Sequence, residues 1–114
     1  MYKAEYYQKD DGSLPVEEYI LSLDYKMKAK VLRTISLLEE YGARLGAPYS
    51  KYLRDGIFEL RIKQSSNSTR VLYFFFEDRR IILTNGFTKK TLRTPPSEFK
   101  LAKDRREHFL RRGQ

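Results

Sequence analysis

The feature that most constrains the fold of this sequence is an unbroken apolar run over residues 71–76. A run of this length between polar, turn-forming segments is typical of a central strand of a sheet. The preceding residues 57–63 alternate between apolar and polar, as a strand with one buried and one polar, cationic face does. The polar residues 64–68 join the two segments as a hairpin. The second half of the chain is therefore predicted to form an antiparallel sheet.

One strand and two helices are predicted before this sheet. Residues 1–7 form a short strand. Ser13 can cap a first helix, and Pro15 suits its first turn because proline has no N–H group to satisfy. A second, longer helix begins at a cap on Asp24, repeats apolar residues every three or four positions, and ends at Gly42. The two helices are expected to be antiparallel and to cover one face of the sheet.

A further strand and a last helix are predicted after the apolar run. Residues 80–87 form the strand, and the helix begins at a cap on Ser97. This basic helix is expected to dock through Phe99, Ala102, Arg106 and Phe109. The predicted order is β-α-α-β-β-β-α, an α+β fold with an antiparallel sheet packed by two N-terminal helices. The length of 114 residues suits one core, so residues 1–114 are predicted to be a single domain.

The net charge of +8 resides in the second half of the chain. Residues 1–50 carry 7 Lys and Arg against 8 Asp and Glu, and residues 51–114 carry 16 against 7. A basic surface attracts polyanions by releasing their counterions, so nucleic acid is expected ahead of an acidic protein or an anionic membrane. A basic protein with no such partner is the plainer alternative.

Nothing in the sequence predicts secretion or membrane insertion. There is no stretch of roughly 18 uninterrupted apolar residues, and the first residues alternate between polar and apolar. The chain has no cysteine, which excludes disulfides and thiolate zinc sites. A cytoplasmic protein is therefore expected.

The usual catalytic constellations are missing from the sequence. His108 is the only histidine, so a two-histidine ribonuclease site has no second base, and a solvated surface role is expected for it. The carboxylates come largely as adjacent pairs, whose side chains diverge, and this does not support a two-metal site. No glycine-rich phosphate loop is present. We therefore expect no metal and no cofactor.

A set of cations on and after the predicted strands carries the remaining chemistry. Arg61 lies on the polar face of its strand, Arg70 begins the next strand, and Lys89 and Lys90 follow the third. Hairpins bring these strand ends together, so the four side chains are predicted to surround one phosphate and stabilise a pentacoordinate phosphorane. RNA supplies its own nucleophile, the 2′-hydroxyl. Glu59 is the nearest proton acceptor, or alternatively a salt-bridge partner of the arginines.

Further side chains near these cations are predicted to contact RNA. Phe87 stacks on an unpaired base in one interpretation and is a core aromatic at a strand end in the other. Lys63, Arg93 and Arg54 are expected to add cationic contacts to the same ligand.

Several short motifs occur in a fixed order along the chain. They are Leu53-Arg54-Asp55-Gly56, Phe58-Glu59-Leu60-Arg61, Thr69-Arg70-Val71-Leu72-Tyr73-Phe74-Phe75, Gly86-Phe87-Thr88-Lys89-Lys90 and Pro95. Their order and spacing resemble the HigB-like branch of the RelE/ParE toxin superfamily, the branch also described as phage-derived Gp49-like proteins. The resemblance spans nearly the whole chain.

The resemblance implies a compact microbial RNase-like fold of RelE type. It implies a type II toxin that cleaves messenger RNA on the ribosome, inhibits translation and is neutralised by a HigA-like helix-turn-helix antitoxin. It also implies that Arg61, Arg70 and either Lys89 or Lys90 occupy catalytic cation positions. Several relatives use a Tyr or His near the C-terminus for proton transfer, whereas residues 91–94 here are Thr, Leu, Arg and Thr. Glu59 and Lys89 therefore remain the candidates for proton transfer.

Two other functions would use the same features. A DNA gyrase inhibitor like those of the ParE branch shares the fold and needs no active site. A non-catalytic nucleic-acid-binding module would use the same cations to hold phosphates. The three functions differ in whether protein synthesis or DNA replication stops first, and in whether bound RNA is cut.

Overall fold

The computed structural model describes residues 1–90 and 92–112, and within them the secondary structure is nearly continuous. The elements are β1 (Lys3–Tyr6), α1 (Pro15–Leu21), α2 (Tyr25–Tyr41), the 3₁₀ turn η1 (Gly42–Arg44), β2 (Ser50–Arg54), β3 (Ile57–Gln64), β4 (Asn67–Phe76), β5 (Arg80–Thr88) and α3 (Pro96–Arg111). The strands form one sheet in the order β1-β5-β4-β3-β2. β1 runs parallel to β5, and the other neighbours are antiparallel. The predicted α+β fold is confirmed, with the apolar run in the middle strand.

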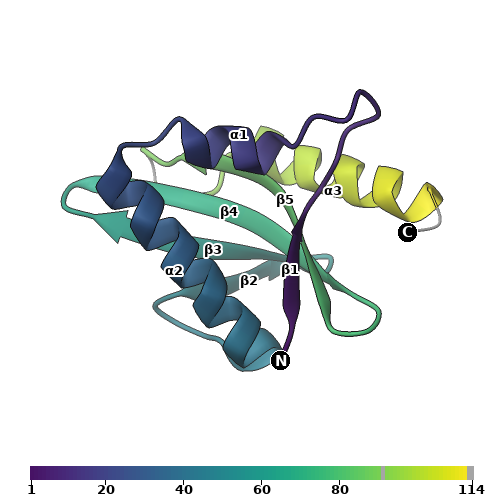
Figure 1. Cartoon of the computed structure of the whole chain (residues 1–114), viewed down its shortest axis with the longest axis horizontal. Helices are drawn as coiled ribbons and strands as arrows, with labels where there is room; N and C mark the ends of the chain where they lie inside the picture. Colours follow the sequence, from purple (N-terminus) through teal and green to yellow (C-terminus); the bar gives the residue numbers. More distant parts are fainter. Residues whose placement is uncertain (91, 113–114) are drawn as a thin grey trace.

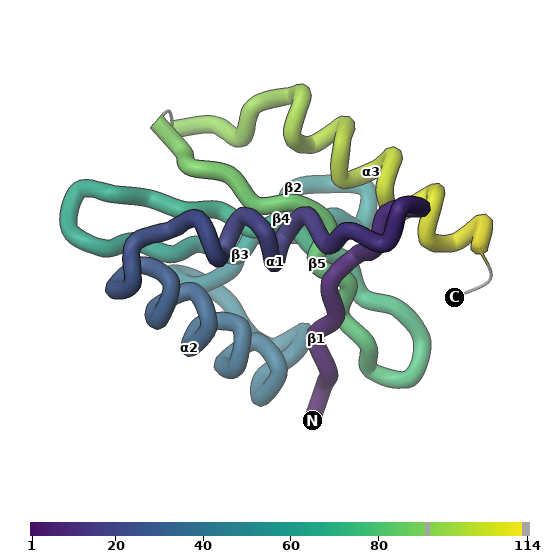
Figure 2. The backbone as a smooth tube through the Cα atoms, turned by 45° about the horizontal axis from the view of Figure 1, so that its top comes forward, coloured from purple at the N-terminus to yellow at the C-terminus, as the bar shows by residue number. Residues whose placement is uncertain are grey.

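Helices lie on both faces of the sheet (Figure 1). An apolar core lies on each face. Helices α1 and α2 cover one face, where Val16 and Leu38 are fully buried. Helix α3 lies on the other side of the sheet from α2 (Figure 2). It docks there through Phe99, Ala102 and Phe109, as the sequence predicts. Residues 71–74 of β4 are therefore buried whichever way their side chains point, and this is why the apolar run is unbroken.

Both predicted ends of α2 are confirmed. The Asp24 carboxylate accepts a hydrogen bond from the backbone N–H of Met27 at 3.0 Å, which is the usual role of an N-cap. Gly42 ends the helix with a φ of 54°, and a Cβ at this position would lie 1.9 Å from the ring of Tyr2. Only glycine meets both requirements, because it has no Cβ and tolerates positive φ.

The predicted caps at Ser13 and Ser97 are wrong. Neither α1 nor α3 has a side-chain cap, and each begins with a proline, Pro15 or Pro96, that lacks the N–H group a cap would satisfy. Ser13 instead binds the carboxylate of Asp11, and Ser97 lies inside the first turn of α3.

Within residues 1–90 and 92–112, none of the helices is long and apolar enough to cross a membrane.

Strand β2 is absent from the sequence prediction, and it changes the order to β-α-α-β-β-β-β-α. It is joined to β3 by the two-residue turn Asp55-Gly56, whose φ angles are 53° and 78°. An Asp-Gly pair with positive φ at both residues is a favoured hairpin connection because its twist matches that of the strands. As expected, regular structure is interrupted around Gly46 and Pro48. The interruption ends at Ser50, where β2 begins.

A chain of hydrogen bonds ties the end of α3 to the segment after β1. The Tyr7 hydroxyl lies 2.6 Å from Nδ1 of His108, and Nε2 of His108 lies 2.8 Å from the Asp10 carboxylate. His108 is half-buried and holds two partners, so its predicted role as a solvated surface residue is corrected. The contact fixes the far end of α3 against the sheet.

Gly86 of β5 lies against Tyr19 of α1, and a Cβ on Gly86 would be 2.6 Å from the tyrosine ring. The Tyr19 hydroxyl is within hydrogen-bond distance of Thr69 and Thr88, so the ring has little freedom to move aside. Gly86→Ala should lower the free energy of unfolding by about 1–3 kcal/mol, measured by urea denaturation. Gly46→Ala is the control, because nothing lies within 4 Å of its Cβ position. Equal effects of the two substitutions would show that α1 does not press on β5.

Candidate active site

Two arginines face each other directly on the side of the sheet that α3 partly covers. Arg61 of β3 is the register partner of Arg70 on β4. Like charges in directly opposed positions destabilise a sheet unless an opposite charge lies between them. Glu59 is that opposite charge, because it precedes Arg61 by two residues and shares its face of β3.

The Glu59 carboxylate is fully buried and contacts three side chains. Its Oε1 lies 3.1 Å from Nε of Arg61 and 3.4 Å from Nε of Arg70. Its Oε2 accepts a hydrogen bond from the Thr94 hydroxyl. Glu59 therefore holds two guanidinium groups and the segment before α3 in one arrangement.

Burial bears on the alternative roles of two residues. In one interpretation Glu59 was the nearest proton acceptor; its exposed fraction is 0%, and both of its oxygens are engaged by protein side chains. The alternative interpretation, a salt bridge to Arg61 and Arg70, describes its position. Of the two interpretations of Phe87, base stacking or a core aromatic at a strand end, its position fits the second, because it is 8% exposed and packs in the core under α3. Its ring has no free face to offer.

Within the described residues, the Arg70 guanidinium makes hydrogen bonds through Nη1 but not through Nε. Nη1 donates to the Ser68 hydroxyl at 2.6 Å and to the Thr69 carbonyl at 3.3 Å. Nε is buried without a hydrogen-bond partner in the described part of the chain, although Glu59 is close enough for charge attraction. Burial lowers the pKa of Arg70, but an arginine remains protonated at any physiological pH.

Lys89, directly after β5, is the least exposed lysine at this site, with an exposed fraction of 8%. Its backbone N–H donates to the Ser68 carbonyl at 2.9 Å. Burial lowers the pKa of Lys89; Glu59 opposes this shift, and repulsion by Arg70 and Arg61 adds to it. Lys89 therefore gives up its proton more readily than an exposed lysine.

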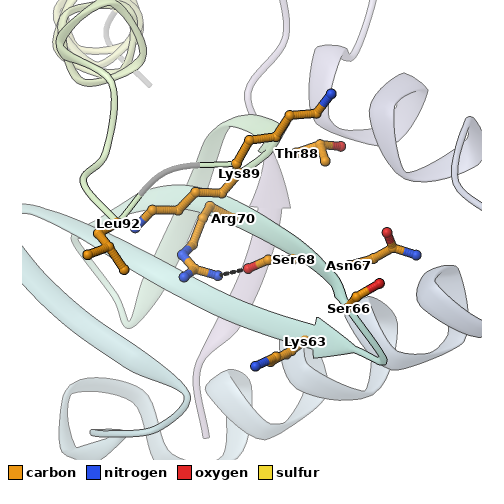
Figure 3. Close-up of a pocket in the computed structure, with 9 residues that line it drawn as sticks. Lys63, Ser66, Asn67, Ser68, Arg70, Thr88, Lys89 and Leu92 are labelled. Atoms are coloured by element: carbon orange, nitrogen blue, oxygen red, sulfur yellow. Dashed lines mark hydrogen bonds between the residues drawn. The ribbon is translucent and has the colours of Figure 1, made fainter.

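Two hollows open beside these residues and share Lys89 and Leu92. The first, of about 650 Å³, lies over the β3–β4 hairpin and the end of β5, and Figure 3 shows the bond from Arg70 to Ser68 within it. The second, of about 410 Å³, lies between β2, β3 and the start of α3. The first is lined by Lys63, Ser66, Asn67, Ser68, Arg70, Thr88, Lys89, Lys90 and Leu92. The second is lined by Lys51, Leu53, Arg54, Glu59, Arg61, Lys89, Leu92, Arg93, Thr94, Pro96 and Phe99.

The hollows bring together all the cations that the sequence singled out. Lys63, Lys90, Arg54 and Arg93 are exposed at the hollows, around the less exposed Arg61, Arg70 and Lys89. Among the described lining residues Glu59 is the only carboxylate, so the surface is strongly positive. A concave surface of one charge sign concentrates ligands of the opposite sign. Thr91, part of the segment compared with relatives above, lies outside the described residues.

Two residues of the site escaped sequence reasoning. Lys51 of β2 is the register partner of Glu59 and lines the second hollow. The Asp55-Gly56 turn is a signal for β2, but a regular hairpin on this turn would pair Tyr52 with Glu59, and it is the register shift between Tyr52 and Arg54 that brings Lys51 opposite Glu59. Thr94 binds Glu59 from the segment before α3. No local pattern marks Thr94, because its contact depends on where that segment crosses the sheet.

The fold and the site define a small α+β protein with a basic, partly buried cluster on one face of its sheet. Residues 18–107 match the family described as phage derived protein Gp49-like (DUF891), and the chain belongs to this family. The match includes β2 to β5 and both hollows. No curated protein matches the chain at a significant level. Within the described residues, no group of three His, Cys, Asp or Glu side chains is arranged to hold a metal ion.

Glu59→Gln should lower the free energy of unfolding by about 3 kcal/mol or more, because it leaves opposed guanidinium groups without their buried countercharge. Urea denaturation measures the change. Glu18→Gln, on the exposed surface of α1, is the control and should change stability by less than about 0.5 kcal/mol. Salt should recover part of the loss by screening the repulsion between Arg61 and Arg70. Unchanged stability of Glu59→Gln would mean that other contacts hold the arginines.

Proposed function

We propose that this protein is the toxin of a type II toxin–antitoxin pair and that it cleaves messenger RNA in the cytoplasm. The observation that carries the proposal is the convergence of Arg61, Arg70 and Lys89 from three different strands and strand ends around the buried Glu59. Clustered, partly desolvated cations reduce folding stability, so their presence favours a functional role. An RNA phosphodiester is the ligand class that suits such a cluster.

The proposed chemistry uses the nucleophile that RNA supplies. The 2′-oxygen attacks the adjacent phosphorus and the bond to the 5′-oxygen breaks, while the 2′-hydroxyl loses a proton and the 5′-oxygen gains one from solvent in the open hollow. Arg61 and Arg70 stabilise the added negative charge of the phosphorane. Neutral Lys89 accepts the 2′-hydroxyl proton, for which its lowered pKa is suited. Glu59 acts as a positioning residue that orients the arginines.

The proposal includes a partner that silences the site. A HigA-like helix-turn-helix antitoxin would neutralise the toxin by placing acidic side chains over the two hollows, because covering the positive charge removes the attraction for RNA. The ribosome as the place of cleavage follows from the resemblance to HigB-like toxins. Gyrase inhibition and RNA binding without cleavage remain the competing functions, and the first experiment below separates them.

Arg70→Ala should abolish cleavage, because it removes a guanidinium that stabilises the phosphorane. Wild type, Arg70→Ala and Arg33→Ala are induced briefly in the same cells, and the 5′ ends of messenger RNA are mapped. Wild type and Arg33→Ala should produce new ends within coding regions, and Arg70→Ala should reduce them at least about 100-fold. Arg33 is the matched control, because it lies on α2, across the sheet from the cluster.

Circular dichroism and thermal melting establish that the Arg70→Ala chain is folded, and the cognate antitoxin should restore growth to cells making wild type. Intact messages in growth-arrested cells would overturn the cleavage proposal. Replication that stops before protein synthesis would favour gyrase inhibition. RNA that is bound with a steep salt dependence and never cut would favour a binding module.

The pH dependence of cleavage tests the role of Lys89. If its neutral amine accepts the proton, the rate rises about tenfold per pH unit below the pKa and levels off at a pH below the ordinary lysine value. The measurement is the initial rate on ribosome-bound messenger RNA between about pH 6.5 and 8.5. Lys89→Arg keeps the positive charge but does not deprotonate in this range, so both the rate and its pH dependence should fall. The same pH profile in both proteins would exclude Lys89 as the acceptor.

A further inference from the structure

The guanidinium of Arg54, a cation of the second hollow, lies on an aromatic ring. Its Cζ is 3.8 Å from the centroid of Phe99, the first buried aromatic of α3. At this separation the planar guanidinium is in van der Waals contact with the ring. Arg54 is exposed and lines the hollow, so the side of the guanidinium away from the ring is open to a ligand.

The backbone places Arg54 there by means of a β-bulge. The register of β2 against β3 shifts between Tyr52 and Arg54. In a regular strand Leu53 and Arg54 would point to opposite faces of the sheet, but a bulge changes the direction of the side chains that follow it. Leu53 therefore packs against the core under α3 while Arg54 lies on Phe99 of the same core.

Helix α3 holds the turn that follows Arg54. Lys103 lies 3.2 Å from the carboxylate of Asp55, and Arg106, which the sequence placed in the docking face, donates to the backbone carbonyl of Asp55. The two contacts connect the β2–β3 turn to the helix that carries Phe99. Arg54 and Phe99 are thus a preassembled stack, and ordering them on ligand binding costs little conformational entropy.

The second hollow differs from the first in what it offers a nucleotide. The first presents Lys and Arg side chains with small polar ones, which suits phosphate groups. The second adds the flat platform of Arg54 on Phe99, and its volume of about 410 Å³ is within the roughly 300–1,000 Å³ range of ligand pockets. Lys89 lines both hollows, so a ligand can place its reacting phosphodiester beside Lys89 and a neighbouring base in the second hollow.

We propose that the second hollow is a base-binding subsite, in which an unpaired nucleobase stacks on the Arg54 guanidinium while Phe99 supports it from behind. The inference rests on the proposed function, because it assumes that the phosphodiester next to this base lies beside Lys89. Stacking on a flat surface accepts any base, because every base has a π-face, and it requires a base that is not paired. The subsite therefore selects single-stranded RNA and not a particular sequence.

The test compares two non-cleavable ligands of equal charge. One is a fluorescein-labelled 2′-O-methyl octanucleotide, and the other is the same backbone with abasic residues. Fluorescence anisotropy should show that wild type prefers the ligand with bases, and that Arg54→Lys reduces this preference about tenfold, the order expected for one stacked base. Affinity for the abasic ligand should stay the same in Arg54→Lys, because the charge is retained while the plane is lost.

Arg44→Lys is the matched control. Arg44 belongs to η1 and lies over the ring of Tyr41, and it lines neither hollow. It should leave the base preference unchanged. A base preference that survives Arg54→Lys, or one that is missing in wild type, would overturn the subsite. Equal loss of affinity for both ligands would overturn it too, because Arg54 would then be a phosphate contact. If the preference depends on Arg54 but messenger RNA is never cut, the subsite stands and the proposed cleavage fails.

Discussion

The cationic face of this protein depends on one buried carboxylate. Arg61 and Arg70 are directly opposed on neighbouring strands, an arrangement that repulsion would disfavour without Glu59 between them. Burial strengthens this interaction, because charges attract and repel more strongly away from water. The same carboxylate binds Thr94 and so fixes the segment that leads into α3. One ion-pair cluster thus sets both the positions of the arginines and the position of the segment with Thr94 that lines the second hollow.

Helix α3 divides the face that carries this cluster. It covers the part of the sheet near Ile57, where the side chains form a dry core, and it leaves the hairpin end with Lys63 open. The cations therefore lie at a border between core and solvent. Arg70 and Lys89 are desolvated enough to have lowered pKa values, yet they line a hollow that a ligand can enter. Phosphate binding at such a border is stronger than at a fully hydrated surface.

Much of the fold can be predicted from local patterns. For the site, the sequence predicts which residue types take part but not the role of each residue. The cap at Asp24, the glycine at position 42 and the apolar run in β4 each act within their own segment, so the sequence reveals them. The cations could be named, but the role of Glu59 could not be decided between base and ion pair. That choice depends on burial, which results from α3 and Thr94 closing over a side chain far away in sequence.

The sequence by itself therefore determines the strand and helix periodicity, the α+β class and the concentration of positive charge in the second half, because these follow from residue type and spacing. Only the tertiary structure decides that Phe87 belongs to the core, that β2 brings Lys51 opposite Glu59, and that a bulge turns Arg54 onto Phe99. The physical reason is that exposure and charge environment depend on which distant segments pack together. A residue's type determines the chemistry it has available, and its packing determines which part of that chemistry it can use.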